Sequence, residues 1–536
     1  MLISGLTRRT YTFLVLFAVV RCGSAFSQGE WEFSAKAPAQ ILPVDAPFPL
    51  AGFSRPSFPD KHFVITDFGA VDRPGTKNAA AIQRAIEAAS SSGGGCVVIP
   101  PGTWLTGAIR LRSNVNLVLE KGSELLFSQD PADYLPAVFA RHEDIECYKY
   151  SSFIYADHCT NIAITGEGTL NGQGRPWWEW KASKRSCEEE LEAMGAKGVP
   201  VEKRVFDGSN GRVLRPAFFQ PMSCTNVLVE GVTFLYGAFW TITPTYCDKV
   251  IIRGVTIRTD GPYGHTPNGD GIDPSSSTNI LIEYCTFDTG DDCIAIKSGR
   301  DTDGLRVHAP TMNVVIRHCV GLAGHGGIVI GSETAGGVQN VYASDCTFHG
   351  TERIVRIKTA RGRGGAIEHM WFRDLSADTI TQEVLHINML YTGTRLPAEM
   401  VTSTTPTISD IHFAKISCGW GKKSAIEITG IPEMPVSDIT FDSIRIGSAT
   451  GVVCSDANNI RFTDLTIRPE SGALLSLVDC ARVAVAGIAI PEGRDAVVVA
   501  DGPKTSGVTI STVGGSGRNI TVHYGPNTSH EAVKIE

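Results

Sequence analysis

Short runs of alternating apolar residues recur along most of this 536-residue chain, each introduced by a polar turn residue. The clearest copies begin at Asn116, Asn161, Asn226, Lys249, Asn279, Asn313 and Asn340, and weaker copies begin at Asp410, Asp438 and Asn459. Successive copies through the centre lie 23 to 34 residues apart, within the range of periods that solenoid repeats show. The pattern predicts one stacked structure rather than several separate domains.

Each repeat has room for two or three strands of about four residues, with almost no helical periodicity between them. This content excludes leucine-rich repeats, and a propeller blade would need about 40 residues with four strands. Asparagine suits the turns of a parallel β-helix because it tolerates left-handed backbone geometry and can stack on its copies as a ladder. We therefore predict an all-β, single-domain parallel β-helix.

A short amphipathic helix precedes the repeats, after a strand and a turn predicted over residues 63–70. Asn78 is a suitable N-terminal cap for this helix, and Gly93-Gly94-Gly95 ends it. Its apolar positions recur at helical spacing: Ala81, Ile82, Ala85, Ile86 and Ala89. Such a helix is the expected cap for the open end of a solenoid.

The first residues predict a secretory signal peptide, because Arg8 and Arg9 precede an apolar stretch at 11–20 and small residues at 25 and 27 suit cleavage. The apolar stretch is about ten residues, against the roughly 20 of a membrane-spanning helix. A membrane anchor is the alternative, as is a lipoprotein at Cys22, which its preceding arginine fits poorly.

These features divide the chain into a signal peptide (1–27), an extended N-terminal arm rich in Pro, Ala and Phe (28–60) and a β-helix (61–536). We expect an exported protein, periplasmic or extracellular, without a membrane span. The formal net charge is −8 and there is no long basic block, so nucleic acid is not an expected partner. We expect a monomer that needs no cofactor.

Several of the 14 cysteines recur at equivalent places in the repeats, such as Cys285, Cys319 and Cys346. Residues that recur once per coil stack on one another, so most cysteines are interpreted as buried thiols. A few disulfide bonds remain open, with Cys147 and Cys187 as candidates. No cysteine or histidine spacing is typical of a zinc site.

Three long polar segments interrupt the repeats, at 173–215, 300–310 and 393–407, and the first contains Trp177, Trp178 and Trp180. Long loops on a solenoid tend to build its binding face. A tolerated surface insertion is an equally good interpretation of each segment taken alone.

Acidic and basic residues gather in four consecutive coils. The motifs are Asn268-Gly269-Asp270, Gly290-Asp291-Asp292, Gly324-His325-Gly326 and Arg356-Ile357-Lys358. Residues one coil apart in a β-helix lie at the strand spacing of about 4.8 Å, so these side chains can line one strip. Each motif alone is commonly a plain turn or a solvent-exposed face. The four motifs together, in order and one coil apart, predict a functional site.

Clustered carboxylates suit glycoside hydrolysis, which needs one group to protonate the leaving oxygen and another to activate water. Mutual repulsion raises the pKa of one such carboxyl group. His325 can adjust the protonation of the cluster. Arg356 and Lys358 alternate on one strand and face the same way, so both can pair with a sugar carboxylate.

In these four motifs the chain resembles the polygalacturonase-type glycoside hydrolases of family 28, and the resemblance extends from Asp67-Phe68-Gly69-Ala70 to about Tyr391. It implies a right-handed β-helix, inverting hydrolysis of α-galacturonosyl linkages in pectic polysaccharide, and no metal. It assigns Asp291 as the general acid, Asp270 and Asp292 as the bases that hold the attacking water, and His325 as the support of the acid.

The resemblance also implies contacts with substrate. Arg356 and Lys358 match the residues that bind the galacturonate carboxylate, Tyr391 matches more loosely a tyrosine at the cleavage subsite, and Asn268 would orient the base or the sugar. Arg363, in Arg361-Gly362-Arg363, could add a carboxylate contact or belong to a surface turn. Gly269 departs from the family, which often has threonine there, in a way that looks harmless.

The layout favours an exo-acting, bacterial type of enzyme, because the Trp-rich segment could close one end of the cleft. Rhamnogalacturonan or a pectic side chain on the same site remains an alternative substrate. A calcium-dependent polysaccharide lyase is a further alternative, although 301–304 lacks the spacing of a calcium loop. A non-catalytic carbohydrate-binding β-helix is disfavoured, since three clustered aspartates would repel an anionic sugar.

Overall fold

The computed structural model describes residues 36–536, except 263, 392, 396, 490–495 and 513–519. The chain divides into two units, Met1–Phe33 and Ser34–Glu536, and the description below concerns the second. The predicted signal peptide, residues 1–27, lies outside the described residues.

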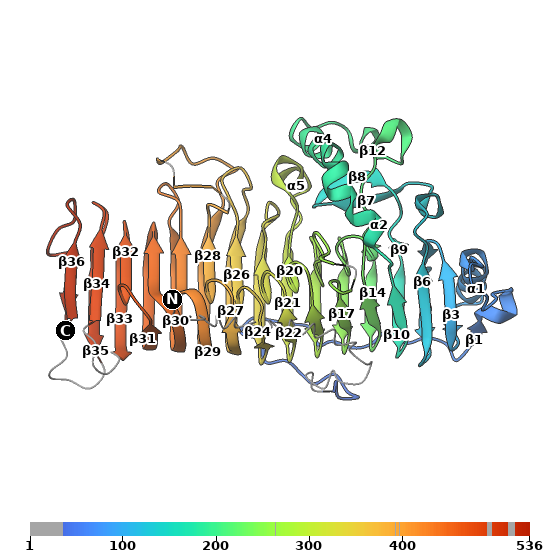
Figure 1. Ribbon diagram of the computed structural model, residues 1–536, viewed down its shortest axis with the longest axis horizontal. Coiled ribbons are helices and arrows are strands. Elements are labelled where there is room, and N and C mark those ends of the chain that lie inside the picture. Colours follow the sequence, from blue (N-terminus) through green and yellow to red (C-terminus); the bar gives the residue numbers. More distant parts are fainter. Residues whose placement is uncertain (1–35, 263, 392, 396, 490–495, 513–519) are drawn as a thin grey trace, which may run out of the picture. The chain divides into compact units, whose positions relative to one another are not determined.

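Parallel strands stack coil upon coil (Figure 1), and their pairings form three faces. The first face contains β1 (His62–Val64), β2 (Gly95–Ile99), β5 (Val115–Leu119), β10 (Thr160–Gly166), β14 (Thr225–Glu230), β16 (Asp248–Arg253), β18 (Thr278–Glu283), β21 (Thr311–Arg317) and β24 (Val338–Ser344). The second contains β3 (Gly102–Thr106), β6 (Ser123–Phe127), β11 (Thr169–Asn171), β15 (Thr233–Leu235), β17 (Thr256–Arg258), β19 (Thr286–Asp288), β22 (Val320–Ala323) and β25 (Thr347–Phe348).

The third face carries the candidate site. It contains β4 (Ile109–Arg110), β9 (Ile154–Asp157), β13 (Phe219–Met222), β20 (Ile294–Ile296), β23 (Ile328–Ile330), β26 (Val355–Lys358) and β28 (Leu385–Asn388). Isolated bridges at Ile242 and Ile272 continue it between β13 and β20. Each strand pairs in parallel with the equivalent strand of the next coil.

Longer strands bend from face to face in the later coils, and they are β27 (Ala366–Ile380), β29 (Thr407–Thr429), β30 (Val436–Ser455) and β31 (Ala457–Pro469). Shorter strands continue the stack after them: β32 (Leu475–Val478), β33 (Ala481–Ala489), β34 (Ala496–Asp501), β35 (Val508–Thr512), β36 (Ile520–Tyr524) and β37 (Val533–Ile535). All of these pairings are parallel, and the fold is the right-handed parallel β-helix that the sequence predicts. Each of the ten repeat starts predicted above lies in a strand of this stack, from Asn116 in β5 to Asn459 in β31.

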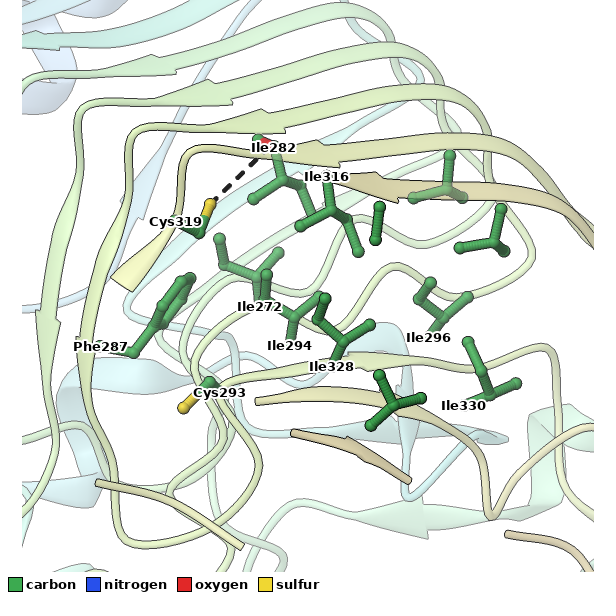
Figure 2. Close-up of a cluster of buried hydrophobic side chains, with 14 of the residues drawn as sticks. Ile272, Ile282, Phe287, Cys293, Ile294, Ile296, Ile316, Cys319, Ile328 and Ile330 are labelled. Atoms are coloured by element: carbon green, nitrogen blue, oxygen red, sulfur yellow. Dashed lines mark hydrogen bonds between the residues drawn. The ribbon is translucent and has the colours of Figure 1, made fainter. Parts of the chain in front are cut away.

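Apolar rows fill the interior because the same inward position recurs in every coil. Ile272, Ile294 and Ile328 follow one another along the stack (Figure 2), each with almost no exposed surface. The rings of Phe372, Phe413, Phe441 and Phe462 stack in a second row. The centroids of successive rings in this order lie 5.1, 4.9 and 4.9 Å apart. These separations follow the strand spacing, so the coil period fixes the packing of the core.

The predicted asparagine ladder is present at the turns of the first face. Asn226 Nδ2 donates to Asn161 Oδ1 at 2.9 Å, and Asn340 Nδ2 donates to Asn313 Oδ1 at 3.0 Å. All four asparagines have φ between 55° and 59°, the left-handed geometry that asparagine tolerates. Each ladder bond satisfies polar groups that the stacking of the turns would otherwise bury.

Most cysteines are buried thiols, as predicted, and Cys96 is the partly exposed one among those described. All thirteen cysteines in the described part of the chain are free, including the bridge candidates Cys147 and Cys187. Stacked cysteines meet across neighbouring coils, as where the backbone N–H of Cys319 approaches Cys346 Sγ at 3.4 Å. Cys319 Sγ also contacts the carbonyl of Ile282 (Figure 2).

The predicted N-terminal helix is α1 (Ala79–Ser91), which buries the five apolar positions named above against the first coils. It follows the short 3-10 helix η1 (Ile65–Phe68). The prediction that Asn78 caps α1 was wrong in its contact, because its side chain makes no capping bond. It accepts instead from Val71 N–H and donates to Leu105 C=O, tying the loop before the helix to β3.

Residues 36–60 contain no helix or strand and lie along the first face. Ile41, Val44 and Phe53 are among the side chains packed on the outward apolar residues of that face. Two buried arginines of the coils fix the backbone: Arg253 donates to Pro38 C=O, and Arg317 donates to Leu42 C=O, each at 2.8 Å.

A helical lobe replaces two of the predicted polar loops. It comprises the antiparallel hairpin β7 (Val138–His142) and β8 (Ile145–Lys149), β12 (Val205–Phe206), α2 (Arg175–Trp178), α3 (Trp180–Ser183), α4 (Arg185–Ala196) and α5 (Asp301–Val307). Three short 3-10 helices are η2 (Pro131–Tyr134), η3 (Val201–Lys203) and η4 (Ser209–Gly211). The lobe lies on one side of the stack of coils (Figure 1).

Candidate active site

A polar cavity of about 210 Å³ lies where the third face meets the lobe. Most of its lining side chains are charged. The lining residues are Glu143, Lys181, Trp240, Asn268, Asp270, Asp291, Asp292, Lys297, Arg300, Ser332, Glu333, Lys358, Arg363 and Tyr391. Seven of the nine predicted site residues are in this set, and His325 and Arg356 are the other two.

The three predicted catalytic aspartates converge because their coils are in register. Asp270 and Asp292 each stand two residues before the paired Ile272 and Ile294, so they occupy equivalent places in adjacent coils. One oxygen of each of Asp270, Asp291 and Asp292 lies within 4.8 Å of the others. Asp270 and Asp292 are buried, and each has one carboxylate oxygen, Oδ1, without a hydrogen-bond partner among the described residues.

Asp291 and His325 form an ion pair at the more exposed side of the cluster. His325 Nδ1 lies 3.0 Å from Asp291 Oδ1. The hydrogen bond to Asp291 raises the pKa of His325 to about 9. Burial alone would raise the pKa of Asp291, but the bond from His325 and the charge of Lys358 lower it to about 2. In the free site the proton expected on Asp291 therefore lies on His325, one hydrogen bond away.

Lys358 holds Asp292 in place. Its Nζ donates to Asp292 Oδ2 at 2.7 Å, with the lysine 6% and the aspartate 1% exposed. Lys358 Nζ also lies 5.8 Å from the ring centroid of Tyr391, which closes that side of the cavity. A charge-assisted hydrogen bond of this kind fixes one oxygen of Asp292 and leaves the other available to water.

Asp270 has a different environment, with a second aspartate and a second lysine. Lys297 Nζ is 3.7 Å from Asp270 Oδ2, 3.8 Å from Asp273 Oδ1 and 3.2 Å from Glu333 Oε2. Burial and the neighbouring Asp273 and Asp291 raise the pKa of Asp270 well above its ordinary value. Lys297 opposes that rise.

Asn268 is held by the lobe. Its backbone is left-handed, at φ 53°, and its Oδ1 accepts from Arg215 Nη2 at 2.7 Å. The same guanidinium donates to Pro267 C=O at 2.6 Å and lies 4.8 Å from the ring centroid of Phe239. Arg215 therefore fixes the segment that enters the catalytic coil.

The predicted carboxylate contacts lie in two places. Arg363 lines the cavity, with Nη1 3.2 Å from Asp301 Oδ1 and 3.8 Å from Glu333 Oε1. Arg356 is outside the cavity lining, on the same strand as Lys358, and its buried Nε has no hydrogen-bond partner in the described part of the chain. Arg361 pairs with Glu433 instead of entering the cavity.

The lobe forms one wall of the cavity. Arg141 Nη1 of β7 donates to Ser275 Oγ and Ser276 Oγ on the third face, each at 2.8 Å. Arg300, at the start of α5, donates to Glu143 Oε2 at 2.6 Å. Lys181 of α3 donates to Glu143 Oε1 at 3.2 Å. The hairpin, α3 and α5 are thereby joined at the cavity edge.

Residues 137–461 match the family model described as Glycosyl hydrolases family 28, a span that contains the whole cavity. The chain belongs to glycosyl hydrolase family 28. A probable polygalacturonase of Vitis vinifera is 30% identical over 411 residues, which cover 74% of this chain and 77% of the relative. An exo-poly-alpha-D-galacturonosidase of Dickeya chrysanthemi is 26% identical and covers 75% of this chain and 70% of the relative.

A solved structure supports the same placement. The hyperthermoactive exopolygalacturonase of Thermotoga maritima superposes with a TM-score of 0.69 at 35% sequence identity, covering 81% of this chain and 93% of that chain. Membership of family 28, whose characteristic mechanism is inverting, makes the protein an inverting glycoside hydrolase. The lyase and the non-catalytic binding protein are thereby set aside. No helix in the described ranges of this hydrolase has the length and apolar character to cross a membrane.

Sequence reasoning missed several residues of this family 28 site, chiefly Lys297, Glu333 and Trp240. A signal for Lys297 existed: it follows Ile296 as Lys358 follows Ile357. These isoleucines belong to one in-register row of the third face. The lobe residues Glu143, Lys181 and Arg300 carried no such signal, because only the folded lobe brings them to the cavity.

Proposed function

We propose that this hydrolase cleaves α-galacturonosyl linkages in pectic polysaccharide and releases sugar units from a chain end. The observation that carries the proposal is a cavity in which three aspartates and several buried cations face each other. The aspartates suit glycosidic cleavage. The cations suit a sugar that carries a carboxylate. Relatives named as polygalacturonases and exo-acting galacturonosidases support the same substrate.

In the proposed reaction, Asp291 takes the proton of His325 through their hydrogen bond and gives it to the glycosidic oxygen as the bond from that oxygen to C1 breaks. A water molecule attacks C1 from the opposite side and loses its proton to Asp270 or Asp292. Their unpartnered Oδ1 atoms are the acceptors that such a water needs.

The spacing of the carboxylates bears on how the water is held. Inverting glycosidases commonly separate their two carboxyl groups by about 6.5 to 9.5 Å. Here the nearest oxygens of the three aspartates lie within 4.8 Å. We infer that the water sits between Asp270 and Asp292, in contact with both, rather than opposite a single base.

Recognition of the sugar carboxylate is assigned to Lys358, Arg356 and Arg363. Lys358 already holds Asp292, so a galacturonate bound beside it would share the ammonium with the base. The buried Arg356 Nε has no hydrogen-bond partner among the described residues, and burial makes such a donor costly to leave unpaired. Arg363 lines the cavity beside Asp301 and would bring a second guanidinium to the sugar carboxylate. Tyr391 and Asn268 complete the proposed sugar contacts.

Release from a chain end is inferred from the lobe. The hairpin β7–β8 is bonded across the third face through Arg141, and Arg300 and Lys181 fill the cavity edge on the same side. A polysaccharide could not continue through that wall. We infer that a terminal sugar enters against it, which gives single units or short fragments as first products.

The test is a product assay on polygalacturonate and on defined galacturonate oligomers. The wild type should release galacturonic acid from the first minutes, and Asp291→Asn should lose that release by about 10²- to 10⁴-fold, the range for a general acid. Asp442→Asn, in β30 of a later coil, is the matched control and should stay active. Proton NMR of the first product should show the inverted anomer.

Two other outcomes of this assay would change the proposal. Random shortening of long chains, with a rapid fall in viscosity, would contradict attack at the chain end. No activity from folded wild-type protein would move the substrate to rhamnogalacturonan or a pectic side chain, to be tested next.

We also propose that the mature enzyme begins after about residue 27 and acts as an exported monomer, because the first residues have the order of a signal peptide. N-terminal sequencing of the secreted protein and light scattering of the purified enzyme test these two points. An intact N-terminus on exported protein would contradict cleavage.

A further inference from the structure

Lys297 is the most enclosed cation of the cavity, and no step of the proposed reaction uses it. It is 3% exposed, and its Nζ lies 4.4 Å from the ring centroid of Trp240. The one hydrogen bond that this ammonium donates in the described structure goes to Glu333 Oε2, at 3.2 Å. A desolvated ammonium is expensive unless carboxylates surround it, and here three do.

We propose that Lys297 is a positioning residue that favours the ionised form of Asp270 and aims its carboxylate at the attacking water. Lys297 follows β20, one coil after Asp270, and Glu333 anchors it from the coil beyond. The lysine is thus held between Glu333, which takes up no proton in the reaction, and Asp270, which must accept one. The inference rests on the proposed function, because it presumes that Asp270 receives the proton of the water.

Asp270 needs this support because its other neighbours are mostly anionic. Asp273 lies on the same coil and Asp292 on the next, and both oxygens of Asp273 are buried without a hydrogen-bond partner in the described structure. The charged groups around Asp270 are Asp273, Asp291, Asp292, Lys297 and, through Asn268, Arg215. Burial beside so many carboxylates favours the protonated form, which cannot act as a base.

Glu333 serves as the anchor of the lysine. Its Oε1 accepts from Ser332 Oγ at 2.8 Å, and Arg363 approaches it from the following coil. Burial alone would raise the pKa of Glu333, but Lys297, Arg363 and Arg300 lower it, so the anchor stays ionised. The charged groups that face Lys297 are Glu333, Asp270, Asp273, Asp291, Asp292 and Asp144.

The experiment compares the pH profile of kcat/KM for trigalacturonate in the wild type, Lys297→Met and Lys297→Arg. Without the cation, Asp270 takes up a proton at higher pH, so the acidic limb of Lys297→Met should move upward by about 1 to 3 pH units. Its activity should be deficient at low pH and recover as pH rises. Lys297→Arg should restore most of the wild-type profile.

A second variant predicts the opposite sign. Glu333→Gln keeps an acceptor for Lys297 but removes the anion that offsets its charge, so Asp270 should hold its proton less tightly and the acidic limb should move to lower pH. The substrate carboxylates also titrate in this pH range, equally in every assay. The result is therefore the difference in the position of the acidic limb between each variant and the wild type. Lys121→Met, which removes an exposed lysine outside the cavity, should leave the limb at its wild-type position.

The outcomes separate this proposal from the proposed function. If the wild type hydrolyses no galacturonate oligomer, the proposed function has failed. If the wild type is active and Lys297→Met raises KM at all pH values with an unmoved acidic limb, Lys297 binds substrate instead, and the positioning role is wrong. Thermal unfolding of each variant checks the fold, and Glu333→Gln keeps the test valid if Lys297→Met does not fold.

Discussion

The stacked coils and the lobe are held together by different forces. In the coils, inward rows such as Ile272 and Ile294 repeat at the strand spacing, so each coil is bound by the one beside it. In the lobe, buried charges connect elements that do not repeat. Arg204 Nη1, for example, donates to Asp303 Oδ1 at 2.8 Å with both side chains 1% exposed.

This difference assigns two functions to two regions. A repeating apolar stack is rigid and fixes distances, which suits the aspartates and their supporting cations. The buried ion pairs of the lobe fix how its helices and hairpin are oriented, and the stability of the lobe depends on every buried charge being paired. We therefore expect changes in the coils to alter the rate of cleavage, and changes in the lobe to alter which products appear.

Asp292→Asn should have the largest effect on rate. The amide cannot accept the proton of water, and Lys358 loses its carboxylate partner, so kcat should fall by about 10²- to 10⁴-fold. The residual products should keep the wild-type size distribution, because the lobe is unchanged. The measurement is chromatography of long incubations with galacturonate oligomers. Longer fragments among the residual products would contradict the division between coils and lobe.

Asp303→Ala should loosen the lobe. It leaves Arg204 buried without its carboxylate and removes the acceptor of Glu146 N–H. Breaking a buried ion pair in this way lowers the free energy of unfolding by about 3 to 5 kcal/mol. Hydrogen exchange should rise over residues 138–215, and longer products should appear while cleavage continues. Glu189→Ala, which breaks the exposed Arg185–Glu189 pair in α4, is the matched control and should change neither result.

The coils were predictable from sequence because each of their features repeats. The turn residues, the inward rows and the motifs at Asp270, Asp291 and His325 all follow one period, and one-coil spacing alone brings the aspartates together. The lobe was not predictable in this way. Arg300 and Glu143 are 157 residues apart and meet only because the hairpin folds across the third face. The helices of the 173–215 segment were missed because its polar composition was interpreted as a loop.

The protonation of the site was partly missed for a related reason. The sequence places His325 near the acid, but the direction of the proton depends on contacts with Lys358 that only the fold supplies. Lys297 was overlooked because the alternation along β20 was not followed beyond its last isoleucine. Both omissions concern charges around the aspartates rather than the aspartates themselves.

His325→Gln should have a moderate effect that depends on pH. The pKa of His325 is about 9, above its ordinary value, so the protonated pair with Asp291 exists below pH 9 and is lost as pH rises through it. Glutamine cannot store the proton, so the acid must hold it alone. We expect the alkaline limb of kcat/KM to move to lower pH, with a roughly 10-fold loss at neutral pH. An unmoved limb would show that His325 does not supply the acid.

Asn313→Ala should have the smallest effect, and it tests the scaffold without touching the chemistry. Asn313 donates to Asn279 and accepts from Asn340, so alanine removes two ladder bonds and places a left-handed φ of 59° on a residue that tolerates it less well. The expected cost is about 1 to 2 kcal/mol, read as a small fall in melting temperature. Because neighbouring coils still pack through their apolar rows, kcat, the pH profile and the product sizes should stay at wild-type values.

The control is the matched substitution Lys249→Ala, at a ladder position that has no asparagine. It should lower the melting temperature less than Asn313→Ala does. A loss of activity in Asn313→Ala with little change in melting temperature would mean that the coil spacing at the site depends on the ladder and not on the core.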